Sequence, residues 1–318
     1  MLTDLSPRVG IVGAGSIGVA FAVVFARAGA AVRLFDADAA RVPVALREVA
    51  ERLAKLEAAA LLDEAAAAAA ARVTAAATLA DALAHAALVI ECAPERVDVK
   101  RALFGQLDAL APADAILASA SSALPVSSFA EHLPGRQRCV IAHPGNPPYL
   151  IPVIEIVPAP FTDPAVADRA AAMFAQAGMK PVRVAKEIEG FVFNRLQGAL
   201  LREAYCLVRD GVASVDDIDT VVRDGLGLRW SVVGPFETVD LNTRGGIASH
   251  AQKMGPAYER MGAERGQHDP WTPDLVERVA AARRAALPLD AWSDRVTWRD
   301  EQLTALVRAR RERGHNDR

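Results

Sequence analysis

The sequence predicts an α/β fold, with a doubly wound sheet in the N-terminal half and an all-α half after it. Three observations support this prediction. Short apolar strands alternate with helical segments up to about residue 184, a glycine-rich turn joins the first strand to the first helix, and the pattern beyond residue 188 is almost entirely helical. Such alternation is typical of a parallel sheet with helices on both faces. We therefore expect a sheet domain at residues 1–187 and a helical domain at residues 188–318.

The first strand, turn and helix form one unit. Arg8–Val12 is a short β-rich run, Gly13–Gly18 has the sequence Gly-Ala-Gly-Ser-Ile-Gly, and Val19–Ala28 is apolar and compatible with a helix. A second apolar strand, Ala31–Phe35, ends at Asp36. A GxGxxG turn between a strand and a helix, followed by a strand that ends in an acidic residue, is the full fingerprint of a Rossmann-type, dinucleotide-binding domain.

The glycines and the acidic residue have distinct roles in this fingerprint. Gly13 allows the tight turn, Gly15 lets the backbone approach a pyrophosphate, and Gly18 lets the helix pack closely on the strand. The helix N-terminus then presents free N–H groups to the phosphates. Asp36 is placed to accept hydrogen bonds from ribose hydroxyls and to repel a 2′-phosphate, so NAD is favoured over NADP. FAD, which uses a similar fingerprint, and a glycine-rich turn in another α/β protein are the alternatives.

Composition and charge exclude several other classes. With 36 Lys and Arg against 39 Asp and Glu, the chain has a net charge of −3, which argues against bulk binding to nucleic acid or an anionic membrane. Its three cysteines lie far apart and form no Cys/His cluster, so we expect neither a metal site nor a disulfide framework. The first residues lack a leader pattern, and the uncharged stretch Val9–Ala26 is rich in glycine, so we expect a cytoplasmic protein with a small-molecule substrate and no membrane span.

The middle of the first domain continues the alternation. Residues 41–81 are rich in helix formers, with seven consecutive alanines at 65–71, and predict a helical hairpin. Strands are expected at Ala87–Ile90 and near Ile116–Leu117, with a helix between them. The segment Ser119–Ser122 follows the second of these strands, at the sheet edge where ligands bind, although a polar turn is the plainer interpretation.

A histidine and a glutamate mark the end of the sheet domain. Cys139–Ala142 is an apolar strand that ends at His143, and Glu155 lies within a second apolar strand, Val153–Val157. Burying a carboxylate in such a strand is costly unless it is paired, and His143 is the obvious partner. A His–carboxylate pair provides a general base for an alcohol proton, which hydride transfer to NAD requires. The alternative is a structural histidine beside a salt-bridged glutamate.

The remaining pattern is helical. A last strand at Pro181–Val184 precedes a helix that runs to about Arg209, and Asn194 in its first turns is placed to reach back over the cleft. Gly225–Trp230 predicts a loop, and Pro235 predicts the first residue of another helix. An ordinary polar surface residue is the alternative for Asn194.

Taken together, these segments resemble the 3-hydroxyacyl-CoA dehydrogenase superfamily, most of all its λ-crystallin / L-gulonate 3-dehydrogenase branch. The resemblance covers nearly the whole chain. It rests on the segments GAGSIG, LFDAD, ECAPE with Lys100, the serine cluster, AHPGNPPYLIPVIEIVP, KEIEGFVFNRLQ, DGLGLRW and GPFETVDLN. The stretch from histidine to glutamate and the segment GFVFNR are specific as a pair, whereas GAGSIG alone is not.

The resemblance implies roles for individual residues. His143 is the expected catalytic base, Glu155 its partner, and Asn194 a hydrogen-bond donor to the reacting oxygen or the histidine. Counting back from the histidine places the substrate-binding serine at Ser122, with Ser121 as the alternate. The resemblance also implies NAD as cofactor and a homodimer formed through the C-terminal helical domain. The positions that match nucleotide-binding residues are Gly13, Gly15, Ser16, Ile17, Gly18, Asp36, Glu95, Lys100 and, near the nicotinamide, Asn146.

Departures from the superfamily pattern bear on the substrate. His143–Pro147 has the sequence His-Pro-Gly-Asn-Pro, where acyl-CoA dehydrogenases usually have His-Phe-Phe-Asn-Pro. The alanine-rich hairpin offers Arg52, Lys55, Arg72 and little else basic to hold CoA phosphates. Arg229, in the GLGLRW segment, is able to bind a free carboxylate bidentately. We therefore expect a small free 3-hydroxy acid, such as L-gulonate, held by Arg229; a surface arginine is the alternative.

Three other functions stay open at this point. The first is a short-chain 3-hydroxyacyl-CoA dehydrogenase. The second is an L-carnitine dehydrogenase, a related enzyme that also carries a Gly-Leu-Arg-Trp segment, although an aromatic cage for its trimethylammonium group is hard to place with three tyrosines and four tryptophans. The third is a non-catalytic, crystallin-like or NADH-binding protein, which the retained His143, Glu155 and Asn194 argue against.

Overall fold

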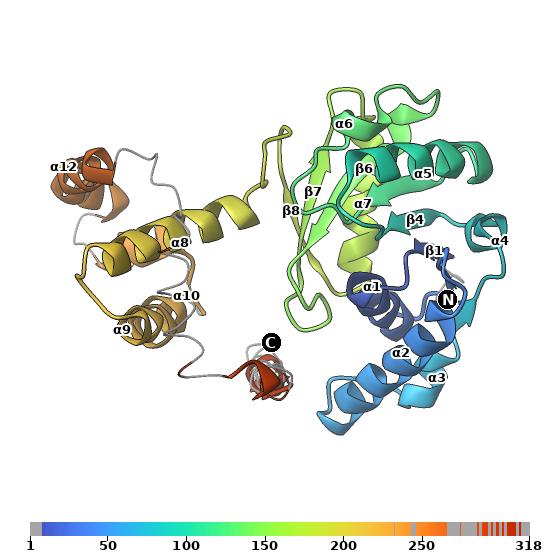
Figure 1. Cartoon of the computed structure of the whole chain (residues 1–318), viewed down its shortest axis with the longest axis horizontal. Helices are drawn as coiled ribbons and strands as arrows, with labels where there is room; N and C mark the ends of the chain where they lie inside the picture. Colours follow the sequence, from blue (N-terminus) through green and yellow to red (C-terminus); the bar gives the residue numbers. More distant parts are fainter. Residues whose placement is uncertain are drawn as a thin grey trace. The chain divides into compact units, whose positions relative to one another are not determined.

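The computed structural model describes residues 8–231, 233–242 and 246–265, together with scattered positions between 274 and 312. The chain divides into two compact units, one comprising Met1–Arg195 and Thr297–Arg318 and the other Leu196–Val296 (Figure 1). The division falls a few residues beyond the predicted boundary at 187/188. The first residues of the long helix stay with the sheet because they are hydrogen-bonded to it, as described below.

The first unit is built on an eight-stranded sheet in the order β3-β2-β1-β4-β5-β6-β7-β8. The first six strands are parallel. Their order reverses at β1, where β2 lies on one side and β4 on the other, which is the topological switch point at which open sheets bind ligands. These strands are β1 (Val9–Val12), β2 (Val32–Phe35), β3 (Val73–Ala75), β4 (Leu88–Glu91), β5 (Ile116–Ser119) and β6 (Cys139–Pro144).

The last two strands depart from a purely parallel sheet. β7 (Val153–Pro158) pairs antiparallel with β6, and β8 (Lys180–Arg183) pairs parallel with β7. The connection between β6 and β7 spans only residues 145–152, which is too short for the crossover that a parallel pair needs. One consequence is that His143 and Glu155 face each other directly in the β6–β7 register.

Helices cover both faces of the sheet (Figure 1). Alternate residues of each strand enter opposite cores: Ile11 and Ile90 pack in one, and Val12 and Val89 in the other. This two-sided burial confirms the predicted doubly wound architecture. The first core includes α1 (Ser16–Arg27), α2 (Arg41–Ala58), α3 (Ala66–Ala70) and α7 (Pro164–Gln176); the second includes α4 (Leu79–Leu83), α5 (Val97–Leu110) and α6 (Ser127–Ala130).

The predicted helical hairpin over residues 41–81 is only partly correct. α2 is long and packs on α3, but the alanine run forms a helix of five residues, because Ala71 ends it and the chain turns into the edge strand β3. The pairing of β3 with β2 is a long-range contact that helix propensity does not reveal. Arg72 at this turn binds Glu64 and the carbonyl of Ala26.

The second unit is helical where it is described, as predicted. The Gly225–Trp230 segment, however, is not a loop: it continues the helix through a π-helical stretch into a short α-helix, since it contains no proline to interrupt the backbone hydrogen bonds. In the part of the chain that the structure describes, no helix is both long and apolar enough to cross a membrane. The helices are α8 (Phe193–Arg209), which begins in the first unit, α9 (Val215–Thr220), η2 (Val221–Gly227), α10 (Leu228–Trp230), α11 (Pro235–Asn242) and α12 (Gly246–Arg265).

Candidate active site

A cleft of about 850 Å³ lies at the carboxyl ends of β1, β2 and β4. Gly13, Gly15, Ser16, Ile17 and Asp36 all line it. Apolar groups form the rest of its wall, as a flat adenine ring requires. These are Val12, Phe35, Ala37, Leu79, Cys92, Ala93, Pro94, Val99, Ala102 and Leu103, joined by Gln106.

The glycine-rich turn is shaped for a pyrophosphate. Gly15 is the N-cap residue of α1, and no side chain caps this helix. A Cβ built on Gly15 would meet no protein atom within 4 Å and would project into the cleft. Gly13 has φ +107°, which favours glycine, and a Cβ on Gly18 would lie 1.9 Å from the carbonyl oxygen of Gly13. The unused N–H groups of the first helical turn remain for an anion. The turn therefore fits NAD.

Asp36 is fixed in place by two backbone groups. Its Oδ2 accepts a hydrogen bond from the N–H of Ala14 at 2.7 Å, and its Oδ1 accepts one from the N–H of Asp38 at 2.9 Å. Each carboxylate oxygen keeps a second lone pair, so Asp36 is able to accept from ribose hydroxyls without losing its own support.

Replacing Gly18 by alanine is expected to weaken NADH binding by more than about tenfold and to destabilise the protein by about 1–3 kcal/mol, because the new methyl group overlaps the Gly13 carbonyl. Fluorescence titration with NADH and thermal unfolding measure both effects. Gly105→Ala in α5 is the matched control, since a Cβ there meets no atom within 4 Å, and it should stabilise the helix by about 0.5–1 kcal/mol. Unchanged NADH affinity in Gly18→Ala would contradict the assignment.

The His143–Glu155 pair forms as predicted. His143 Nδ1 lies 2.7 Å from Glu155 Oε2, and both residues are buried in the sheet, at 5% and 1% exposure. A carboxylate only accepts hydrogen bonds, so Nδ1 donates and the lone pair of the ring is on Nε2. The rings of Phe191 and Phe193 pack against the imidazole, with centroids at 5.6 and 6.2 Å. The imidazole is thus held in one orientation by its partner and its neighbours.

Glu155 also holds the start of α8. Its Oε1 accepts hydrogen bonds from the N–H groups of Val192 at 2.7 Å and Phe193 at 3.0 Å. Burial raises the pKa of Glu155, but the hydrogen bonds from His143 and from these two N–H groups outweigh it and keep the pKa below its usual value. Both carboxylate oxygens are therefore used, one for the histidine and one for the helix.

That helix start carries Asn194 to the serine loop. Asn194 Nδ2 donates a hydrogen bond to the carbonyl oxygen of Ser122 at 2.8 Å. Ser122 itself is exposed, whereas Ser121 is fully buried and its hydroxyl bonds to Glu95 Oε1 at 2.5 Å and to the backbone of Leu124. The structure thus brings His143, Glu155, Asn194 and the serine loop into one hydrogen-bonded region of the first unit.

Glu95 supports the same loop from the other side. Besides Ser121, the N–H groups of Ser122, Ala123 and Leu124 all donate to its Oε1, at 3.0–3.2 Å. Partial burial raises the pKa of Glu95, but the hydrogen bonds from Ser121 and from the backbone of Ala123 and Leu124 lower it further, so the net shift is downward. In this structure Glu95 therefore orders the serine loop.

Lys100 belongs to a buried cluster that the sequence interpretation missed. Its Nζ lies 2.9 Å from both carboxylate oxygens of Glu91, and Ser119 Oγ donates to Glu91 Oε2 at 2.5 Å. Lys100 is 1% exposed and Glu91 0%, and Glu95 Oε2 is 3.8 Å from the amine. The sequence did contain a signal for this cluster: Glu91 ends an apolar strand, and a buried carboxylate requires a cation as its partner. The cluster joins the ends of β4 and β5 beneath the serine loop.

Two further candidate residues are Asn146 and Arg229. Asn146 is exposed in the β6–β7 connection, next to a cis peptide bond to Pro147. Arg229 lies in α10 of the second unit; it is exposed, and it forms no ion pair with another residue that the structure describes.

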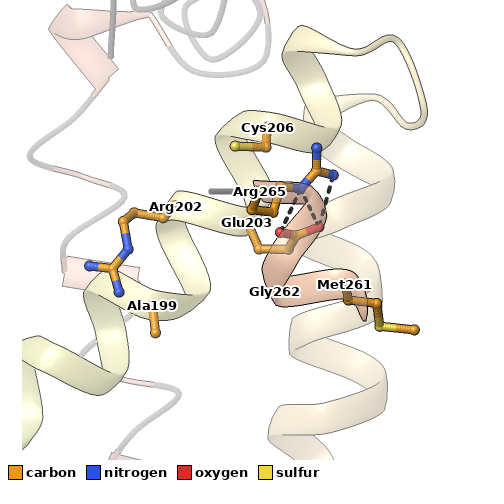
Figure 2. Close-up of a pocket in the computed structure, with 7 residues that line it drawn as sticks. All are labelled: Ala199, Arg202, Glu203, Cys206, Met261, Gly262 and Arg265. Carbon is orange, nitrogen blue, oxygen red and sulfur yellow. Dashed lines mark hydrogen bonds and ion pairs between the residues drawn. The ribbon is translucent and has the colours of Figure 1, made fainter. Parts of the chain in front are cut away.

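The helical unit contains a hollow of its own, of about 360 Å³, between α8 and α12 (Figure 2). Arg265 projects from α12 toward α8, where it binds Glu203 at 3.0 Å, and it also pairs with Asp210 at 2.6 Å. Its charge is thus already compensated by two carboxylates, and the cluster serves to join the two helices.

The sheet topology and the dinucleotide cleft together define a Rossmann-type, dinucleotide-binding domain, and the family match below makes the protein an NAD-dependent oxidoreductase. Comparison with known families agrees. Residues 8–188 match the 3-hydroxyacyl-CoA dehydrogenase NAD binding domain, and residues 190–286 match the 3-hydroxyacyl-CoA dehydrogenase C-terminal domain. The chain belongs to the 3-hydroxyacyl-CoA dehydrogenase family.

Several relatives match over nearly the full length. Lambda-crystallin of Oryctolagus cuniculus is 37% identical, with 96% of this chain and 98% of the relative covered. An L-carnitine dehydrogenase of Streptomyces griseus is also 37% identical, with 95% and 89% covered. Among solved structures, that of 5-formyl-3-hydroxy-2-methylpyridine 4-carboxylic acid 5-dehydrogenase, an NAD⁺-dependent dismutase, is 27% identical and superposes with a TM-score of 0.79, covering 96% of this chain and 98% of that one.

Proposed function

We propose that the protein oxidises a small free 3-hydroxy acid, L-gulonate or a similar compound, at C3. The observation that supports the reaction is the His143–Glu155 pair, joined through the start of α8 to Asn194 and the Ser122 loop. NAD, when bound, supplies the hydride acceptor. The chain's own task is then to remove the hydroxyl proton and to steady the oxygen as it becomes a carbonyl.

His143 is the proposed proton acceptor. Because Glu155 accepts from Nδ1, the lone pair of Nε2 takes the substrate proton, and the carboxylate stabilises the resulting imidazolium. Ser122 and Asn194 steady the oxygen. The Asn194 amide has two N–H groups, of which one is donated to the carbonyl of Ser122 and the second remains for the substrate.

The choice of a free acid over a CoA ester rests on the basic residues of the α2–α3 region. Arg72 is bound to Glu64 and to the carbonyl of Ala26, and Arg52 is bound to the carbonyl of Ser16. Both guanidinium groups are therefore engaged within the protein. Of the three cations singled out there, Lys55 alone is left for CoA phosphates, whereas Arg229 in the second unit is exposed and able to bind a carboxylate.

A substrate panel tests this function. Free L-gulonate, 3-hydroxybutyrate and L-carnitine are compared with 3-hydroxybutyryl-CoA, each with NAD and with NADP, by the appearance of reduced cofactor at 340 nm. We expect the highest kcat/KM with a free 3-hydroxy acid and NAD. A higher kcat/KM for the CoA ester, or for carnitine, would contradict the proposal and identify the other branch. Absence of any substrate-dependent signal would favour a non-catalytic NADH-binding protein.

Replacing Arg229 by alanine is expected to raise KM for free 3-hydroxy acids by about 10–100-fold, because a charge-assisted bidentate contact contributes about 1.5–3 kcal/mol. Steady-state kinetics with the best acid of the panel measures it. Arg223→Ala is the matched control, since Arg223 is an exposed arginine nearby in the chain that is already paired with Asp224. An unchanged KM in Arg229→Ala would remove Arg229 from the site.

The protein is also proposed to form a homodimer through its helical domain. Large apolar side chains are exposed on the described part of that unit, which is more than a solvated helical surface normally shows. Light scattering should give a mass of about twice 33.7 kDa. These side chains are Leu196, Leu200, Leu201, Val212, Val221, Leu228, Trp230, Phe236, Leu241, Ile247, Tyr258 and Met261.

A further inference from the structure

A group of charged residues on α2 lies beside the cofactor cleft and has no role in the proposed chemistry. Arg41 Nη1 binds Glu48 Oε1 at 2.7 Å, and Arg52 Nη2 lies 3.5 Å from the other oxygen of Glu48. Both arginines also reach the glycine-rich turn, where Arg41 Nε donates to the carbonyl of Ala14 at 2.9 Å and Arg52 donates to that of Ser16 at 3.3 Å.

Arg41 is close to the residue that selects the cofactor. The N–H of Ala14 is bound to Asp36, and the carbonyl of the same residue accepts from Arg41, so the carboxylate and the guanidinium are held by the two backbone groups of one residue. The hydrogen bond to Glu48, and then the charges of Glu48 and Asp36, raise the pKa of Arg41 above its usual value. An arginine at this place, beyond the end of β2, is the residue type that binds the 2′-phosphate in NADP sites.

We propose that Glu48 is a specificity-determining residue that binds Arg41 and withholds it from a 2′-phosphate. NAD selectivity then depends on two carboxylates with different tasks. Asp36 repels the 2′-phosphate directly, whereas Glu48 occupies the cation that would otherwise attract it. The side chain of Asp38 accepts from the N–H of Ala40 and forms no ion pair with either arginine among the described residues, although the carbonyl of Asp38 accepts from the backbone N–H of Arg41. Without Glu48, Nε of Arg41 still donates to the carbonyl of Ala14, and the Nη1 group that Glu48 had bound becomes available to the phosphate.

Cofactor binding tests this proposal without any substrate. NADPH and NADH are titrated by fluorescence against Asp36→Ser and two double variants, Asp36→Ser/Glu48→Gln and Asp36→Ser/Glu51→Gln. Glu51 is an exposed glutamate of the same helix, so its replacement makes the same charge change without touching Arg41. A triple variant, Asp36→Ser/Glu48→Gln/Arg41→Ala, removes the released cation. Glu48→Ala, in place of Glu48→Gln, repeats the comparison with a residue of higher helix propensity.

The double variant with Glu48→Gln should bind NADPH about fivefold more tightly than the double variant with Glu51→Gln, because one exposed cation is released. The two double variants should bind NADH with nearly equal affinity. The gain should disappear in the triple variant. Three results would overturn the proposal: equal NADPH affinity in the two double variants, a gain that persists without Arg41, or equal changes for NADPH and NADH. The last of these would assign Glu48 a purely structural role in the glycine-rich turn.

Discussion

Replacing His143 by alanine is expected to lower kcat by about 10²–10⁴-fold, the usual contribution of a general base. The side chain is buried, bonded through Nδ1 to Glu155 and packed on two phenylalanine rings, so the truncation removes the one group that Glu155 orients as a base. The glycine-rich turn and Asp36 do not contact the imidazole, and NADH affinity should therefore change by less than about threefold. Stopped-flow or steady-state rates, with NADH titration alongside, measure the two quantities.

His132→Ala is the matched control for this variant, because His132 is an exposed histidine of the same unit. It should keep wild-type kinetics. The pH profile adds a second readout: a base lost from the reaction removes the acid limb of kcat/KM, whereas a purely structural defect lowers the curve without changing its shape. Near-full turnover in His143→Ala would show that another group takes the proton.

Local rules predicted the parts of this fold whose neighbours are close in sequence. The turn from Gly13 to Gly18 and the position of Asp36 follow from the steric needs of one strand, one turn and one helix, and the structure has them in a common cleft. The His143–Glu155 pair was predictable for a different reason. A carboxylate within an apolar strand must find a partner, and a histidine ended the strand before it.

Long-range contacts explain the features that were missed. β3 forms because it pairs with β2 about 40 residues earlier, which alanine propensity does not reveal. Glu95 stays a predicted nucleotide-binding residue, and the structure adds hydrogen bonds with which it orders a loop 26–29 residues further along the chain. The same argument that identified Glu155 applies to Glu91, a carboxylate that ends an apolar strand, and applying it there would have predicted the buried pair with Lys100.

Replacing Glu155 by glutamine should be nearly as damaging as replacing the histidine, although the change is isosteric. Oε1 of the wild-type carboxylate accepts from Val192 and Phe193, and Oε2 accepts from His143. The glutamine amide has only one oxygen. If that oxygen keeps accepting from the N–H groups of Val192 and Phe193, the NH₂ group of the amide faces His143 Nδ1. Nδ1 must then be the acceptor, so the ring proton moves to Nε2, where the lone pair for the substrate proton is needed. In Ser-His-Asp triads the equivalent change lowers kcat by about 10⁴. We expect a loss of about 10²–10⁴-fold here.

The same substitution should lower stability by about 1–3 kcal/mol at neutral pH, since a buried acceptor is lost. The pKa of Glu155 is lower in the folded protein than its usual value, so its carboxylate stabilises the fold above that usual value and loses this effect as the pH falls through the lowered pKa. The urea unfolding curves of wild type and Glu155→Gln should therefore converge in acid. Glu187→Gln is the control: one oxygen of Glu187 accepts from the N–H of Ser127, a bond that the glutamine oxygen is able to keep, and no bond to the histidine is made, so this change should cost little stability and leave kcat unchanged. Equal kcat values for Glu155→Gln and Glu187→Gln would show that Glu155 only supports α8 and does not orient the base.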